Sequence, residues 1–141
     1  MQSNQIFHMK FYKRILVCGD RNWTDYDLIK SALEGLTHSS TECIIEGEAL
    51  GADTCAREAA MTLNLPVLKY RAKWEEHGKA AGPIRNQQMI DEGDPDLVLV
   101  FHDDLPNSKG SKDMVRRARK HGLPVFHYMH FNDGMIRMEI R

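Results

Sequence analysis

The amino-acid sequence predicts an α/β fold, namely a doubly wound, mainly parallel sheet of about five strands with helices on both faces. Short apolar runs alternate with segments whose apolar residues recur at helical spacing, an alternation typical of βα units joined by right-handed crossovers. The apolar runs are continuous, which indicates strands buried on both faces. With 141 residues, the chain is expected to form one domain with a sizeable core.

The five predicted strands are spread over most of the chain. The first runs from Arg14 to Cys18 and ends at Gly19, and the others lie at 43–45, 66–70, 96–101 and 124–128. The predicted domain spans 13–130 and follows an N-terminal extension, 1–12, that has no clear period. The remaining 131–141 form a C-terminal tail whose alternating apolar and charged residues fit one more edge strand.

Two helices are predicted in the first half of the chain. The segment from 28 to 36 carries apolar residues at helical spacing. Thr24 is its expected N-cap, with Asp27 in the capping-box position. The segment from 52 to 63 presents a face of small alanines, which suits close packing on a sheet.

Two further helices are predicted in the second half. One runs from about 83 to 91 with Gly82 as its N-cap, and the other from 111 to about 121 with Ser111 as its N-cap. The connection before the first of them, 71–81, is longer than is usual in α/β units. Extra length at such a place often serves a binding loop.

Composition and charge argue against several classes of function. The formal net charge is −1, which gives no support for a nucleic-acid or membrane partner. Three cysteines without C-x-x-C pairing fit packed thiols in a reducing cytosol, so we expect a cytoplasmic protein. His127 and His130 are expected on opposite faces of a strand, and neither a metal nor a cofactor is predicted. The basic run at 116–120 is interpreted as a solvated helix face, and homo-oligomerisation is left open.

Polar, glycine-bearing loops follow the first four predicted strands. In doubly wound sheets, ligands bind beyond the carboxyl ends of the strands, so we expect these loops to converge on one cleft. The expected ligand-binding residues are Gly19, Arg21, Gly47, Gly51, Asp53, Lys79, Gly82, Arg85, Asn86, Gly110 and Ser111.

The stretch from 78 to 89 is the strongest candidate for a phosphate site. Its glycines and alanines leave the backbone accessible, and Pro83 suits the first position of a helix. Arg85 then falls in the first turn, where the partial positive charge of the helix N-terminus disfavours a cation. An anion held by Lys79, Arg85 and free N–H groups removes that penalty. The alternative is a solvated turn whose cations face water.

Several other loop residues have two interpretations each. Asp53 either stabilises the dipole of its helix or accepts hydrogen bonds from ribose hydroxyls. Trp23 and Trp74 either stack on a base or pack within the protein. Arg21 offers a planar fork to a phosphate, and Ser111 offers a hydroxyl beyond its capping role.

Together these segments resemble the YspA-type, cpYpsA-related branch of the SLOG superfamily, which includes the lonely-guy phosphoribohydrolases and the DNA-processing protein DprA. The matching pieces are 14–21, Gly47-x-x-x-Gly51-Ala52-Asp53, Gly82-Pro83-x-Arg85-Asn86-x-x-Met89 and Gly110-Ser111. The resemblance implies a Rossmann-like domain that binds a nucleotide-derived small molecule across these loops.

One departure from that family bears on catalysis. Lonely-guy enzymes carry a catalytic glutamate in a Pro-Gly-Gly-x-Gly-Thr-x-x-Glu motif, where this chain has Met114, with Asp113 one residue earlier. One residue turns a helical side chain by about 100°, so we expect a sensor or binding module for a nucleoside phosphate or an NAD- or ADP-ribose-like molecule.

The alternative is an enzyme that turns the ligand over. It would be a nucleotide N-glycosidase, or phosphoribohydrolase, that releases the base from a nucleoside monophosphate. Glu48, Asp53 and Asp113 are the candidates for a catalytic carboxylate that replaces the missing glutamate from another position. If the chain only binds, Met114→Glu is expected to raise base release by installing the missing group.

Overall fold

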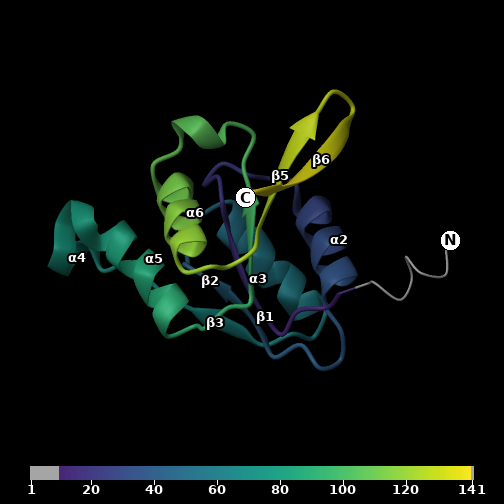
Figure 1. Ribbon diagram of the computed structural model, residues 1–141, viewed down its shortest axis with the longest axis horizontal. Coiled ribbons are helices and arrows are strands. Elements are labelled where there is room, and N and C mark those ends of the chain that lie inside the picture. Colours follow the sequence, from purple (N-terminus) through teal and green to yellow (C-terminus); the bar gives the residue numbers. More distant parts are fainter. Residues whose placement is uncertain (1–9, 141) are drawn as a thin grey trace, which may run out of the picture.

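A six-stranded sheet runs through the computed structural model, which describes residues 10–140 (Figure 1). Its strands are β1 (Arg14–Gly19), β2 (Cys43–Glu46), β3 (Val67–Lys69), β4 (Leu97–Phe101), β5 (Val125–Phe131) and β6 (Gly134–Ile140). They lie in the order β3-β2-β1-β4-β5-β6. Strands β1 to β5 are parallel, and β6 is antiparallel to β5 at the edge. The predicted doubly wound, mainly parallel fold is confirmed.

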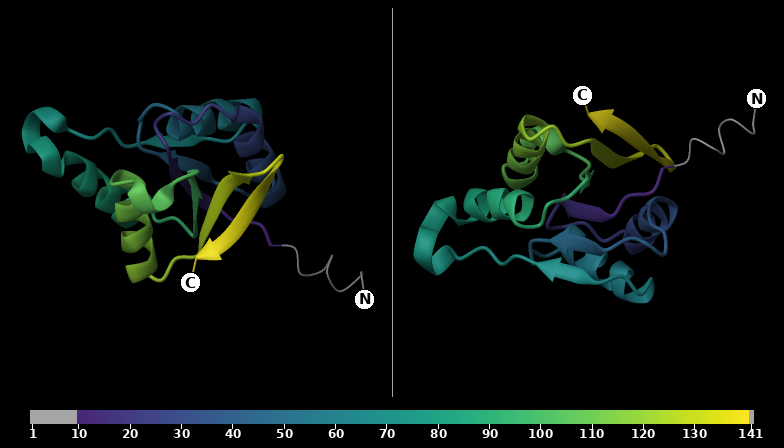
Figure 2. Two further views of the ribbon diagram at one scale, coloured as in Figure 1. Left: turned by 90° about the horizontal axis from the view of Figure 1, so that it is seen from above. Right: turned by 60° about the horizontal axis from the view of Figure 1, so that its bottom comes forward.

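Helices cover both faces of this sheet. The helices α2 (Tyr26–Leu36) and α3 (Ala52–Thr62) pack on one face, and α5 (Ala81–Asp91) and α6 (Gly110–Lys120) pack on the other (Figure 2). The short helix α4 (Trp74–His77) stands away from the sheet (Figure 1), and two 3-10 turns, η1 (Gly78–Ala80) and η2 (Leu105–Asn107), complete the described elements. None of the helices within 10–140 has the length and apolar character needed to cross a bilayer.

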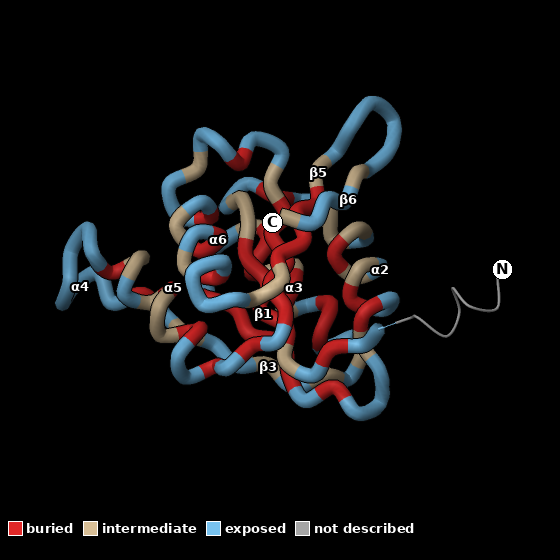
Figure 3. The backbone as a smooth tube through the Cα atoms, in the orientation of Figure 1, coloured by how far each residue is buried: buried red, intermediate tan, exposed pale blue. Residues whose placement is uncertain are grey.

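The strand residues show why both faces need a helical layer. Along β1, Ile15 and Val17 pack into the core beneath α2 and α3, while Leu16 and Cys18 pack into the core beneath α5 and α6. Every residue of β4 is buried, and Figure 3 shows the buried strands at the centre of the molecule. Strands buried on both faces have continuous apolar sequences, which is why they could be predicted.

The ends of the chain are described only in part. Residues 1–9 of the predicted extension and Arg141 lie outside the described residues. Tyr12, near the end of the extension, is buried against the core, and its N–H donates to the Leu36 carbonyl at 3.0 Å.

All three predicted helix N-caps are wrong, including Gly82, because α5 begins before it. Helix α2 is capped by Asp25 and not by Thr24, because Asp25 Oδ1 accepts a hydrogen bond from the Leu28 N–H at 3.1 Å. A carboxylate at this position also complements the helix dipole. Helix α6 starts one residue earlier than predicted. Ser108 Oγ accepts from the Ser111 N–H at 3.0 Å, so Ser111 lies buried inside the first turn.

The long loop predicted at 71–81 is partly helical. Helix α4 and the turn η1 lead directly into α5, which begins at Ala81. Gly82 and Pro83 therefore lie within its first turn, and Gly82 is not the N-cap. The helix tolerates this proline because first-turn N–H groups have no intrahelical partner to lose.

Candidate functional site

The loops that follow β1 and β2 meet at Gly51. The Ala52 N–H donates to the Asp20 carbonyl oxygen at 3.0 Å. Gly51 has a φ of +74°, and a Cβ built there would lie 2.3 Å from the Asp20 oxygen and 2.4 Å from the Arg21 carbonyl carbon. Only glycine fits this conformation and this approach. Gly51 thus holds two of the predicted ligand loops together at the carboxyl edge of the sheet.

Arg85 joins helix α5 to the loop after β2. Its Nη1 donates a hydrogen bond to the Gly47 carbonyl oxygen. A Cβ at Gly47 would lie 2.5 Å from Nη1 and 2.8 Å from Cζ of Arg85. The absence of a side chain at Gly47 is therefore what lets the guanidinium lie against the loop backbone.

Asn86 extends this connection to helix α6. Its Oδ1 accepts from Arg85 Nε at 3.2 Å, and its Nδ2 donates to the Gly110 carbonyl at 3.2 Å and to Asp113 Oδ2 at 3.0 Å. The Asn86 side chain is buried, so these bonds replace water for all of its polar atoms. The carboxyl-edge loops and the start of α6 thus form one connected polar network.

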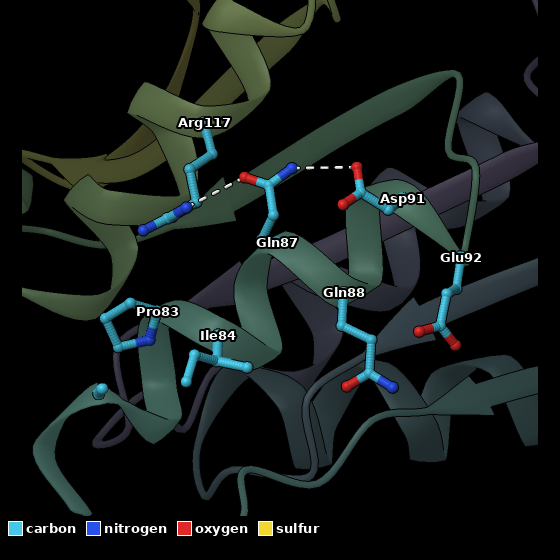
Figure 4. Close-up of a pocket in the computed structure, with 8 residues that line it drawn as sticks. Pro83, Ile84, Gln87, Gln88, Asp91, Glu92 and Arg117 are labelled. Carbon is cyan, nitrogen blue, oxygen red and sulfur yellow. Dashed lines mark hydrogen bonds between the residues drawn. The ribbon is translucent and has the colours of Figure 1, made fainter. Parts of the chain in front are cut away.

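Asp113 is the ionised end of that network. Its carboxylate accepts from Arg117 Nε at 2.7 Å and from Arg116 Nη2 at 2.6 Å. Partial burial favours a higher pKa, but the hydrogen bonds from Arg117 and Asn86 outweigh it and lower the pKa of Asp113. The basic run at 116–120 is therefore more than a solvated face, because Arg117 also donates to Gln87 on α5 at 3.0 Å (Figure 4).

Asp53 organises the loop between β2 and α3. It is 6% exposed, and its Oδ2 accepts from the Gly47 N–H at 3.0 Å and the Ala49 N–H at 3.2 Å. Burial raises the pKa of Asp53, against opposing effects of the Ala49 N–H, the Arg85 charge and the Gly47 N–H. The loop is thus shaped around this carboxylate, and the ribose role of Asp53 stays a prediction.

Glu46 and Arg57 are part of the site, and sequence reasoning missed them. Glu46 ends β2 fully buried, pairs with Arg57 at 3.2 Å, and accepts from the Glu48 N–H at 2.6 Å. Glu48 itself lies at the surface, 3.9 Å from Lys69. The sequence did contain a signal for Glu46, which is an acidic residue at the end of an apolar strand. A buried carboxylate needs a partner, so such a residue indicates a nearby cation or donor.

The N-terminus of helix α5 is continuous with the turn η1, and the phosphate role of Lys79 and Arg85 stays a prediction. The Ala81 N–H already donates to the Gly78 carbonyl, because η1 precedes the helix directly. Arg85 points to Gly47 and not along its own helix. Lys79 is exposed, with no hydrogen bond or ion pair within 10–140.

The predicted aromatic residues lie in different surroundings. Trp23 is 5% exposed, with its ring stacked on His130 at 4.7 Å and edge-on to Phe101 at 5.7 Å. The Trp23 ring is thus buried against other rings of the protein, which favours the packing interpretation over base stacking. Trp74 on α4 is 57% exposed, and its stacking role stays a prediction. Arg21 is also exposed, beside Gly51.

Met114 does not face the site. Its side chain is fully buried in the core beneath α5 and α6, whereas Asp113 points to Asn86. The expectation that Met114→Glu places a carboxylate in the site is therefore wrong, because the new group would enter the core.

Two comparisons with known proteins bear on this arrangement. A family model described as the YspA, cpYpsA-related SLOG family matches residues 13–77. The Gene 61 protein of Mycobacterium phage D29 is 35% identical over 123 residues, which cover 82% of this chain and 96% of the phage protein. The family match includes the loops around Gly19, Gly47 and Gly51, and the similarity to the phage protein extends over most of the chain.

Proposed function

This chain belongs to the YspA, cpYpsA-related SLOG family, and on that premise we propose that it binds a nucleotide-derived ligand at the carboxyl edge of its sheet. The ligand class is a nucleoside phosphate or an NAD- or ADP-ribose-like molecule, and the role is that of a sensor or binding module. The ligand would lie over the loops around Gly19, Gly47 and Gly51 and the starts of α5 and α6.

The observation that carries the proposal is the guanidinium of Arg85. It is held by two neutral oxygens, those of Gly47 and Asn86, and forms no ion pair within 10–140. By contrast, Arg57 is paired with Glu46 at 3.2 Å, and Arg14, at the opposite edge of the sheet, with Glu42 at 3.0 Å. Asp53 is close enough for the Arg85 charge to lower its pKa but makes no ion pair with it. A positioned guanidinium with no carboxylate in ion-pair contact suits a planar, bidentate contact with phosphate.

Binding without turnover is the better supported role. Proton transfer to a leaving base needs a group that can exchange its proton near neutral pH. Met114 is buried and apolar, and the lowered pKa of Asp113 keeps that side chain ionised and hydrogen-bonded to two arginines. The alternative N-glycosidase would use Asp113 only to stabilise positive charge on the sugar, since it lies on the side of α6 that faces Asn86.

Mass spectrometry of small molecules that co-purify with the protein tests the proposal, followed by calorimetric titration with nucleosides, their 5′-monophosphates and ADP-ribose. We expect saturable binding of a phosphorylated ligand and negligible release of free base. Robust base release that Asp53→Asn, Glu48→Gln or Asp113→Asn abolishes would select the glycosidase instead. Absence of binding by every member of the panel would reject the proposed ligand class.

A further inference from the structure

A small hollow lies between the segment that leads out of β3 and the helix α5 that leads back. Figure 2 shows these two segments joined by α4 at the far end. The hollow measures about 60 Å³ and is lined by Arg71, Lys73, His77, Ala81, Ile84, Arg85 and Gln88. It opens beyond the carboxyl end of β3, and through Arg85 it adjoins the loop at Gly47.

The hollow is lined by basic side chains and by no carboxylate. Arg71 is partly neutralised by Glu75 at 2.5 Å, and His77 lies 3.8 Å from Glu76, but both carboxylates are well exposed and lie outside the lining. Lys73 has no ion pair in the described part of the chain. The three cations of the lining, Arg71, Lys73 and Arg85, outnumber these two carboxylates, so the hollow keeps its positive character.

A second hollow along the same helix shows that this character is local. It is larger, about 600 Å³, and its lining includes Asp91 and Glu92 together with Arg117 (Figure 4). In it, Gln87 bridges Arg117 and Asp91 by hydrogen bonds of 3.0 Å each. That hollow contains both signs of charge, already paired through a neutral amide, and offers an anion no comparable site.

We propose that the hollow of Arg71, Lys73, His77 and Arg85 is a phosphate site. Arg85 Nε and Nη1 are engaged by Asn86 and Gly47, so the guanidinium is fixed while Nη2 is left for an anion. Pockets for whole small-molecule ligands measure roughly 300–1,000 Å³, so a hollow of about 60 Å³ takes a phosphate group and not a nucleoside. Given the proposed function, it holds the phosphate of the nucleotide-derived ligand, whose nucleoside extends toward Gly47.

Two charge-reversal variants test this assignment. Lys73→Glu removes one attraction to the phosphate and adds one repulsion. Lys120→Glu makes the same change in net charge at the far end of helix α6, where the side chain is exposed and does not line the hollow. We expect Lys73→Glu to weaken binding of the monophosphate that the wild type binds by about threefold to tenfold, because one exposed attraction is lost and one repulsion is added. Its effect on the matching nucleoside, and the effect of Lys120→Glu on either ligand, should stay within about twofold.

The outcomes separate this inference from the proposed function. If the monophosphate binds and Lys73→Glu binds it no more weakly than Lys120→Glu, the phosphate lies elsewhere, while nucleotide binding stands. If no nucleotide binds, the proposed function fails, and phosphorus NMR titration with inorganic phosphate decides on the hollow. Line broadening that is lost in Lys73→Glu and retained in Lys120→Glu supports the hollow. Its absence in the wild type, or its persistence in Lys73→Glu, overturns it.

Discussion

Replacing Met114 by glutamate should unfold the protein more readily and should not create an enzyme. The Met114 side chain is fully buried in the core between the sheet and helix α6. Removing its buried apolar surface costs about 1.5–3 kcal/mol, and burying an unpartnered neutral carboxyl group costs about 1–3 kcal/mol more. We therefore expect the free energy of unfolding to fall by about 3–5 kcal/mol, a large part of the total for such a domain.

The destabilisation by Met114→Glu should grow as the pH rises. Burial disfavours the charged form, so the folded-state pKa of the new carboxyl lies above its unfolded value of about 4.3. Below that value both states carry the proton and the penalty is smallest. Between the two pKa values the unfolded state releases the proton first, so stability falls with increasing pH.

Urea denaturation followed by circular dichroism measures this effect, with Met61→Glu as the matched control. Met61 lies on helix α3 with 68% of its surface exposed, so its replacement should change stability by less than about 0.5 kcal/mol. A Met114→Glu variant with the wild-type midpoint would refute the placement of Met114 in the core. Base release by that variant would in addition show that position 114 faces the ligand.

The remaining predictions concern glycine geometry and one histidine. Gly47→Ala should push Arg85 off the loop and weaken nucleotide binding by about 1.5–3 kcal/mol, with stability within about 1 kcal/mol of wild type because only a flexible side chain must move; unchanged affinity in calorimetry would contradict the role of Arg85. Gly51→Ala should destabilise the protein by at least about 1–3 kcal/mol, because the φ of +74° is strained for alanine and the added Cβ would in addition clash with the backbone of Asp20 and Arg21. Gly35→Ala, with open space around it, should not destabilise the protein; equal midpoints for the two variants would disprove both the left-handed conformation and the close loop contact at Gly51. Hydrogen bonds to two aspartates, Asp25 first and then Asp103, raise the pKa of His130. Its charged form therefore adds stability that is complete below the unfolded pKa of about 6.5 and is lost as the pH rises through the folded pKa. The thermal midpoint should thus fall more steeply with pH for the wild type than for His130→Gln, and parallel curves would count against this ion cluster.

Strands β1, β2 and β4 could be predicted because their burial on both faces requires continuous apolar sequences. Helix ends were less predictable, since they depend on side chains that compete for the same N–H groups. Thr24 and Asp25 both suit a cap, and only the path of the chain selects Asp25. In the same way, nothing local distinguishes a glycine-rich loop at 78–80 from the turn η1 that continues into α5.

The candidate site was predictable in its glycines and not in its contacts. Gly51 and Gly47 stand out in the sequence, but the groups that exclude a side chain there, Asp20 and Arg85, come from other loops. The pairing of Asp113 with Asn86 could not be seen, because it depends on how α5 and α6 pack. Aligning Met114 with the catalytic glutamate of a motif failed for the same reason. Helix α6 starts one residue earlier than predicted, and no local feature of the sequence shows which of its faces is buried.

The most direct test of the central claim is to map which residues contact a nucleotide-derived ligand. Amide chemical shifts can be mapped by NMR during titration with the monophosphate or ADP-ribose that binds most tightly. We predict the largest changes at 19–23, 47–53, the first turns of α5 and the start of α6. Changes concentrated at the opposite edge of the sheet, around Arg14 and its hydrogen-bond partners Gly93 and Asp96, would contradict the account.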